Sequence, residues 1–70
     1  MITLAQIQNK LIEAITTSSI SKAEISRRVN ISSPTLSQYL SGRAMPALDT
    51  FANLCKVLDV SADDILCIYD

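Results

Sequence analysis

The stretch SKAEISRRVNISSPTLSQYLSG, from Ser21 to Gly42, carries the strongest local structural signals in this chain of 70 residues. Ser21 and Glu24 have the spacing of a capping box, in which each residue satisfies a backbone amide of the other. The pattern therefore predicts that a helix begins here and runs over residues 22–29. The apolar residues that share one face of this helix are Ile25 and Val29.

A second helix is predicted after a turn of three residues. Asn30 directly follows the first helix, and Asn tolerates the left-handed conformation that often ends a helix. Ser32 can cap a helix over residues 33–40, and Gly42, the only glycine, follows where a left-handed C-cap is expected. The inward residues are Leu36, Tyr39 and Leu40. Two short helices joined this tightly form a helix-turn-helix, whose second helix can enter the major groove of DNA.

Helical periodicity extends to both sides of this stretch. Thr3 and Gln6 form a second capping box, which predicts a helix over residues 4–17. Its apolar stripe is Leu4, Ile7, Leu11, Ala14 and Ile15. A further helix is expected over residues 48–58. The apolar stripe expected for it is Leu48, Phe51, Ala52, Cys55 and Leu58.

The end of the chain predicts one more helix. Ser61 and Asp64 resemble a capping box and open a helix expected over residues 62–68. Short connections and one apolar face per helix indicate an all-α fold. We therefore expect residues 1–70 to form a single, compact five-helix domain with the helix-turn-helix at residues 21–42.

Composition narrows the function classes. With 49% hydrophobic residues the chain can build a core, yet it has no apolar run long enough to cross a membrane. The N-terminus lacks the basic and apolar regions of a signal peptide, so we expect a cytoplasmic protein. We also expect no separate sensor domain within these 70 residues.

Catalytic and metal chemistry find little support. The chain has no histidine, no phosphate-binding glycine loop and no nucleophile with a recognisable base, so we expect neither an enzyme nor a cofactor. Cys55 and Cys67 are expected to be reduced, buried thiols, because two cysteines without histidine do not make a zinc site. Asp63 and Asp64 diverge on a helix and are better explained as stabilising its start.

Charge is unevenly distributed along the chain. The net charge is −1, which by itself argues against a nucleic-acid partner. Residues 20–46 nevertheless contain four cations and one anion, a local net charge of +3, whereas residues 47–70 carry −4. The positive segment coincides with the helix-turn-helix, where DNA phosphates would lie. An ordinary solvated surface of mixed charge is the alternative interpretation.

Several short motifs together resemble a known family. They are Ile25, Ile31-Ser32, Leu36-Ser37, Ser41-Gly42-Arg43 with Pro46, Leu48-Asp49-Thr50-Phe51, Leu58-Asp59-Val60-Ser61 and Asp64-Ile65. This set resembles the lambda-repressor-like helix-turn-helix family of phage repressors, Cro-type proteins and xenobiotic-response-element regulators. The positions that depart from the usual family pattern are Lys22 for Gln, Ser26 for Ala, Asn30 and Asp59 for Gly, and Pro34 in the first turn of the recognition helix.

The resemblance implies which residues face the bases. The implied base-contacting residues are Ser33, Pro34, Thr35, Ser37 and Gln38. Gln38 is the strongest candidate, because its amide can pair with N6 and N7 of adenine. The alternatives are that Gln38 is an ordinary solvated residue and that Ser33 bonds its own backbone. Thr35 and Pro34 could instead pack on a thymine methyl group.

Phosphate contacts are implied elsewhere. The candidates are Lys22, Ser41 and Arg43, with Arg27 and Arg28 as possible additions or else solvated charges. So few contacts predict weak binding by one subunit, and therefore a homodimer on double-stranded DNA with half-sites one turn apart. Subunits could pair through Val57, Ile68 and Tyr69. Alternatively Ile65, Leu66 and Ile68 close the core.

Two functions follow as hypotheses. The first is a sequence-specific DNA-binding transcriptional regulator, a small repressor or Cro-like, phage-like protein that occludes a promoter. The second is a protein that keeps the fold, binds DNA weakly or not at all, and modulates another regulator by binding it. The acidic total and the short side chains of Ser33-Pro34-Thr35 motivate the second hypothesis.

Overall fold

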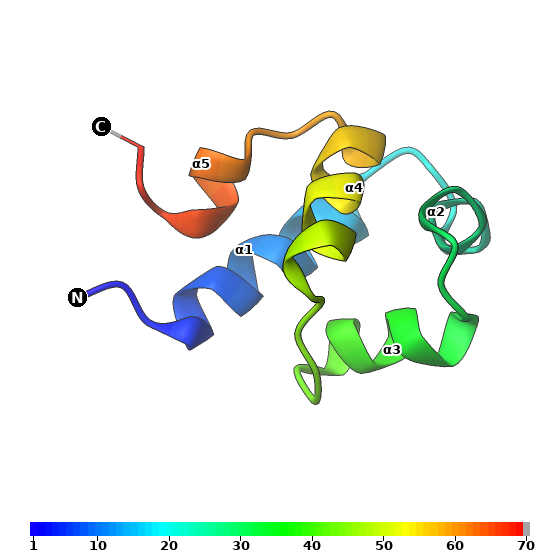
Figure 1. The fold of residues 1–70 in the computed structure, drawn as a ribbon, viewed down its shortest axis with the longest axis horizontal. Helices are drawn as coiled ribbons and strands as arrows, with labels where there is room; N and C mark the ends of the chain where they lie inside the picture. The colour runs from blue at the N-terminus through cyan, green and yellow to red at the C-terminus, as the bar shows by residue number, and fades with distance from the viewer. Residues whose placement is uncertain (70) are drawn as a thin grey trace.

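A computed structural model describes residues 1–69, and the only regular secondary structure within this range is α-helix. The five helices are α1 (Leu4–Thr17), α2 (Lys22–Val29), α3 (Ser33–Ser41), α4 (Leu48–Leu58) and α5 (Ala62–Leu66). In Figure 1, α2 and α3 lie at one end of the molecule, and α5 packs against α1 toward the other end. The all-α, five-helix prediction is confirmed.

Helix starts follow the capping signals only in part. Thr3 and Gln6 form the complete capping box, with the Thr3 amide donating to Gln6 Oε1 over 2.8 Å and the Gln6 amide donating to Thr3 Oγ1 over 3.3 Å. Ser21 Oγ accepts the Glu24 amide over 3.1 Å, but the Glu24 carboxylate pairs with arginines instead of returning to Ser21. The prediction at Ser61 was wrong, because its side chain makes no cap bond. The aspartates of the first turn of α5 favour that helix start through its dipole instead.

Four of the five helices end in the same way. The residue after each has a left-handed backbone, with positive φ values of 61° at Asn30, 78° at Gly42, 56° at Asp59 and 63° at Cys67. At each end the amide of this residue and the amide of the next residue bond back to carbonyls in the last turn, which is the Schellman motif. The motif at Cys67 ends α5 at Leu66, two residues before the end predicted at 68.

All five helices contribute buried side chains to one core, in which α2 packs on α3 and α4, and α1 packs on α3 and α5. The four largest fully buried side chains are Leu11, Ile15, Ile25 and Leu54. The predicted stripe of α4 was wrong in part, because Leu48 is 85% exposed and Ala52 is exposed, while Leu54 is completely buried. Leu4, expected on the buried stripe of α1, is 59% exposed because α1 projects past the core at its first turn.

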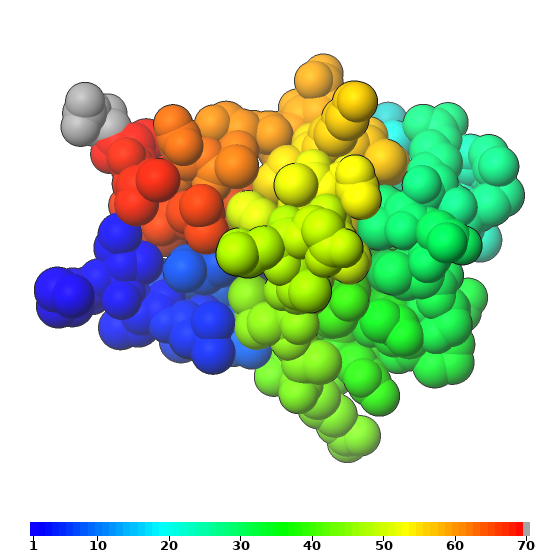
Figure 2. Space-filling view, in the orientation of Figure 1, coloured from blue at the N-terminus to red at the C-terminus, as the bar shows by residue number. Residues whose placement is uncertain are grey.

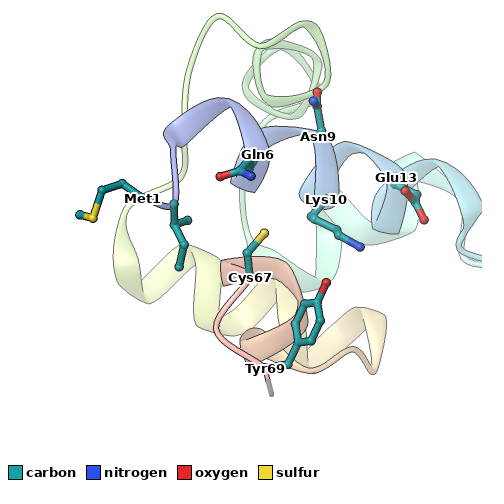
Figure 3. Close-up of a pocket in the computed structure, with 8 residues that line it drawn as sticks. Met1, Gln6, Asn9, Lys10, Glu13, Cys67 and Tyr69 are labelled. Carbon is teal, nitrogen blue, oxygen red and sulfur yellow. The ribbon is translucent and has the colours of Figure 1, made fainter.

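The end of the molecule that holds both termini contains an open hollow (Figure 3). Lys10 Nζ lies 6.0 Å from the centre of the Tyr69 ring, and the Cys67 side chain points toward α1. Cys67 is therefore half-buried rather than buried as predicted, whereas Cys55 is buried and burial raises the pKa of its thiol. The lining residues are Met1, Ile2, Gln6, Asn9, Lys10, Glu13, Cys67 and Tyr69.

The apolar chain end divides between core and surface. Ile65 is buried and Leu66 is half-buried against the core, so these two close it as one interpretation expected. The same interpretation placed Ile68 in the core, but Ile68 is 55% exposed because the chain turns away at Cys67. Tyr69 is also exposed, whereas Val57 packs partly against the core.

Ser26 generates a prediction about stability. Its hydroxyl is buried in α2 and has no hydrogen-bond partner within residues 1–69. Ser26→Ala should raise the free energy of unfolding by about 1–2 kcal/mol, because it removes an unpaired polar atom and improves helix propensity. Urea denaturation followed by circular dichroism measures this. Ser37→Ala on the exposed face of α3 is the matched control and should gain only about 0.5 kcal/mol; a loss of stability at Ser26 would contradict the prediction.

Asp59 generates a second prediction. It adopts a left-handed conformation at the negative end of α4, so both its backbone and its charge are unfavourable there. Asp59→Gly should raise the free energy of unfolding by about 0.5–1 kcal/mol, because glycine relieves the backbone strain. Asp59→Asn removes the charge and keeps a side chain, so thermal unfolding should rank the variants Gly above Asn above Asp. Equal stability of all three would show that neither effect operates.

Candidate nucleic-acid interface

The turn between α2 and α3 holds the two helices in a fixed relation. The Asn30 amide donates to the Arg27 carbonyl over 3.3 Å, and the Ile31 amide donates to the Ser26 carbonyl over 3.0 Å. The inward faces of the two helices are both buried, through Ile25, Val29, Leu36 and Tyr39. The opposite side of α3 is consequently directed away from the core.

That outer side of α3 carries most of the residues expected to read bases. The exposed ones are Ser33, Pro34, Ser37 and Gln38, and Ser41, expected to contact a phosphate, is exposed on the same helix face. Figure 2 shows the green segment containing α3 and the loop after it at the lower edge of the molecule. Thr35 differs, because it is half-buried and its hydroxyl lies 2.8 Å from Ser32 Oγ.

The first turn of α3 has few amides left for a ligand. Ser32 Oγ accepts the Thr35 amide over 3.2 Å, and the Ser32 carbonyl accepts the Leu36 amide over 3.1 Å. Pro34 has no amide proton at all. Anion binding by the helix N-terminus is therefore weak at α3, and contacts from this helix depend on its side chains.

The loop after α3 is tied to the rest of the molecule. The Arg43 amide donates to the Gln38 carbonyl over 3.0 Å, and Gln8 of α1 donates from Nε2 to the Gly42 carbonyl over 3.2 Å. Ser41 Oγ also donates to the Gln38 carbonyl, over 3.1 Å. Sequence reasoning missed Gln8, because nothing in the local pattern relates it to a loop 34 residues away. The tether holds the backbone next to Arg43, whose side chain is exposed.

The cations of α2 fall into two groups. Lys22 is the first residue of α2, is exposed, and makes no ion pair within residues 1–69. Arg27 and Arg28 both pair with Glu24: Arg27 Nε lies 3.0 Å from Glu24 Oε1, and Arg28 Nε lies 2.7 Å from Oε2. Arg27 Nη2 makes a further bond to Oε2, so the Arg27 pair is bidentate.

This cluster changes the titration of its carboxylate. Hydrogen bonds from Arg27 and then Arg28 lower the pKa of Glu24 to about 2. Glu24 is therefore ionised at every pH at which the protein would ordinarily work. Of the four cations between residues 20 and 46, Lys22 and Arg43 form no ion pair in the described part of the chain, and the other two share one carboxylate.

The described part of the chain contains neither a metal site nor a helix able to span a membrane. Within residues 1–69 no group of three or more metal-ligating side chains lies close enough to hold a metal ion. Among the helices of that range, none combines the length and the apolar content that crossing a membrane requires. The candidate functional surface therefore remains the one formed by α2, α3 and the loop after α3.

Helices α2 and α3 are joined by a turn of three residues, and the outer side of α3 is exposed. This arrangement defines a helix-turn-helix. Comparison with protein families agrees: the model of a helix-turn-helix family, HTH_3, matches residues 11–65, well over half of the chain. The chain therefore belongs to this lambda-repressor-like helix-turn-helix family. It is a family of DNA-binding transcription regulators and not of enzymes. Comparisons with curated proteins and with solved structures each gave no significant match.

The depressed pKa of Glu24 predicts how stability depends on pH. The folded-state pKa of about 2 lies below an unfolded value of about 4.3, so the contribution of this carboxylate is present above the unfolded value. It is lost as the pH falls from about 4.3 toward 2. Urea midpoints measured from pH 7 to 2.5 should fall less steeply in Glu24→Gln than in the parent protein.

Glu13→Gln provides the control for this experiment, because Glu13 is an exposed carboxylate of α1 that forms no ion pair in the described range. This variant should keep the acid sensitivity that comes from Glu24. Parallel curves for Glu24→Gln and the parent protein would contradict the prediction.

Proposed function

We propose that this protein is a sequence-specific transcriptional repressor of the Cro-like kind, which reads the major groove with α3. The observation that carries the proposal is the exposed face of α3, where Ser33, Ser37 and Gln38 stand opposite the buried Leu36 and Tyr39. Gln38 supplies the main base contact through its amide, and adenine is the base it suits best. Ser33, Pro34 and Ser37 add short-range contacts. Thr35, whose hydroxyl lies against the cap, contributes mainly its methyl group, for example to a thymine.

Phosphate contacts would flank the base-reading helix. Lys22 at the start of α2 and Arg43 after α3 make no ion pair within residues 1–69, and Ser41 is exposed at the end of α3. We expect two to four phosphates per subunit, which gives a slope of log affinity against log salt of roughly −2 to −4. Such a small footprint favours a homodimer on two half-sites about one DNA turn apart. Repression then follows from occlusion of a promoter.

One observation favours the second candidate, a protein-binding modulator of another regulator. The first turn of α3 has its Thr35 amide occupied, lacks an amide proton at Pro34 and carries only short side chains. Such a surface binds DNA less strongly than one with long polar side chains and free amides. In that case α3 and the loop after it would contact a protein instead of DNA.

Fluorescence anisotropy with a random-sequence duplex at about 50 and 200 mM salt tests DNA binding directly. Selection from a random pool then defines the preferred site. On that site Gln38→Ala should weaken binding by about 1–3 kcal/mol and relax specificity at one base pair, with the salt slope unchanged. Arg43→Ala should weaken binding to all sequences alike and reduce the slope by about 1.

Matched controls lie on α4. Asn53→Ala removes an exposed amide, and Lys56→Ala removes a cation from the last turn of α4, the end that lies away from α3 in Figure 1. Both should leave affinity and specificity close to those of the parent protein. If the folded parent protein fails to bind at the lower salt concentration, the DNA proposal fails and the modulator becomes the leading function.

A further inference from the structure

We propose that Glu24 limits the affinity of this protein for DNA phosphates by holding Arg27 and Arg28 in an ion-pair cluster on α2. The inference rests on the proposed function and assigns a role to a residue that is not itself expected to touch DNA. The three side chains lie on neighbouring turns of one helix, at spacings of three and four residues. Replacing Glu24 alone, and then all three residues together, therefore tests how α2 contributes to binding.

The geometry of the cluster shows what Glu24 takes from the two arginines. It accepts Nε and Nη2 of Arg27 and Nε of Arg28, so both of its oxygens are used. A bidentate pair uses the same fork of donors that an arginine presents to a phosphate. The Nε and Nη2 donors of Arg27 are therefore already bonded to Glu24 and cannot bind a phosphate in the same bidentate way.

The exposure and the charge of the two arginines indicate that, without Glu24, both could contact a phosphate. Their side chains are 71% and 49% exposed, so burial does not explain why they face Glu24. With Glu24 ionised, the three residues carry a net charge of +1; without it they carry +2. Since α2 packs directly on α3, this charge belongs to the helix next to the proposed reading helix. Salt screens such charges over about 10 Å.

A weak phosphate contribution has a functional consequence. Phosphate contacts are independent of sequence, so they strengthen binding to all DNA alike. A protein whose cations are partly neutralised spends less time on random DNA and depends more on the base contacts of α3. Glu24 would then set the balance between retention on DNA in general and release from it.

The test is the salt dependence of binding by Glu24→Gln to a random-sequence duplex, measured by anisotropy between about 50 and 200 mM salt. The variant should bind more tightly at the lower salt concentration, and its slope should steepen by about 1. This corresponds to a further loss of about fourfold in affinity over that range of salt. Gln is accepted at this position of a helix start, so the fold should be retained; Glu24→Ala serves as a second variant, and circular dichroism checks both.

Glu13→Gln is the matched control, since it removes one exposed negative charge on α1, outside the cluster. It should leave the slope unchanged. The triple variant Glu24→Gln, Arg27→Gln, Arg28→Gln should lose the gain, because the gain acts through the arginines. An equal effect of Glu24→Gln and Glu13→Gln would reduce the result to net charge and overturn the inference.

The outcomes also separate this inference from the function on which it rests. If the parent protein and Glu24→Gln both fail to bind random DNA at low salt, the DNA function itself fails. If the parent protein binds and Glu24→Gln binds more weakly, Glu24 orients the arginines toward DNA, and its proposed limiting role is wrong. Tighter binding with a steeper slope supports the inference.

Discussion

Reversal of the chain at Asn30 is the constraint on which the surface of α3 depends. A connection of only three residues between α2 and α3 requires a left-handed backbone, and this chain has a single glycine, placed after α3. Asn meets the requirement with a φ of 61°, and the Schellman bonds around it satisfy the last carbonyls of α2. Because the turn fixes how the helices cross, the inward residues of α3 reach the core and its other face is left exposed.

Local rules account for most of the fold. The caps at Thr3, Ser21 and Ser32 and the left-handed ends at Asn30 and Gly42 are short-range effects, so sequence spacing was enough to predict them. The end of α5 was not predictable in this way. Cys67 adopts a left-handed conformation that its residue type does not favour, and only the packing of the chain end against α1 distinguishes it from one more helical residue.

Tertiary packing determines which face of α4 is buried, because the apolar periodicity of its sequence allows more than one. Helix α4 has apolar residues on several faces, so a stripe through Leu48 and Ala52 fits the period as well as one through Leu54. Only the position of the other helices selects Leu54. The same limit applies to the candidate site. Spacing predicted the inward residues of α3, and the family resemblance implied its base-reading residues. The tether from Gln8 and the pairing of Glu24 with two arginines required coordinates.

The acidic total of the chain is compatible with DNA binding once the charges are located. Lys22 and Arg43 stand at the two ends of the α2–α3 unit, while most of the carboxylates belong to residues 47–70. Because salt screens charges beyond about 10 Å, a bound phosphate interacts mainly with nearby charges and only weakly with the net charge of the molecule. With few cations left unpaired within residues 1–69 and an occupied helix start at α3, contacts with the DNA backbone would contribute little affinity to the proposed complex. Base contacts and the proposed pairing of subunits would then supply a large share of the binding energy, so that recognition would depend more on sequence than on general affinity for DNA.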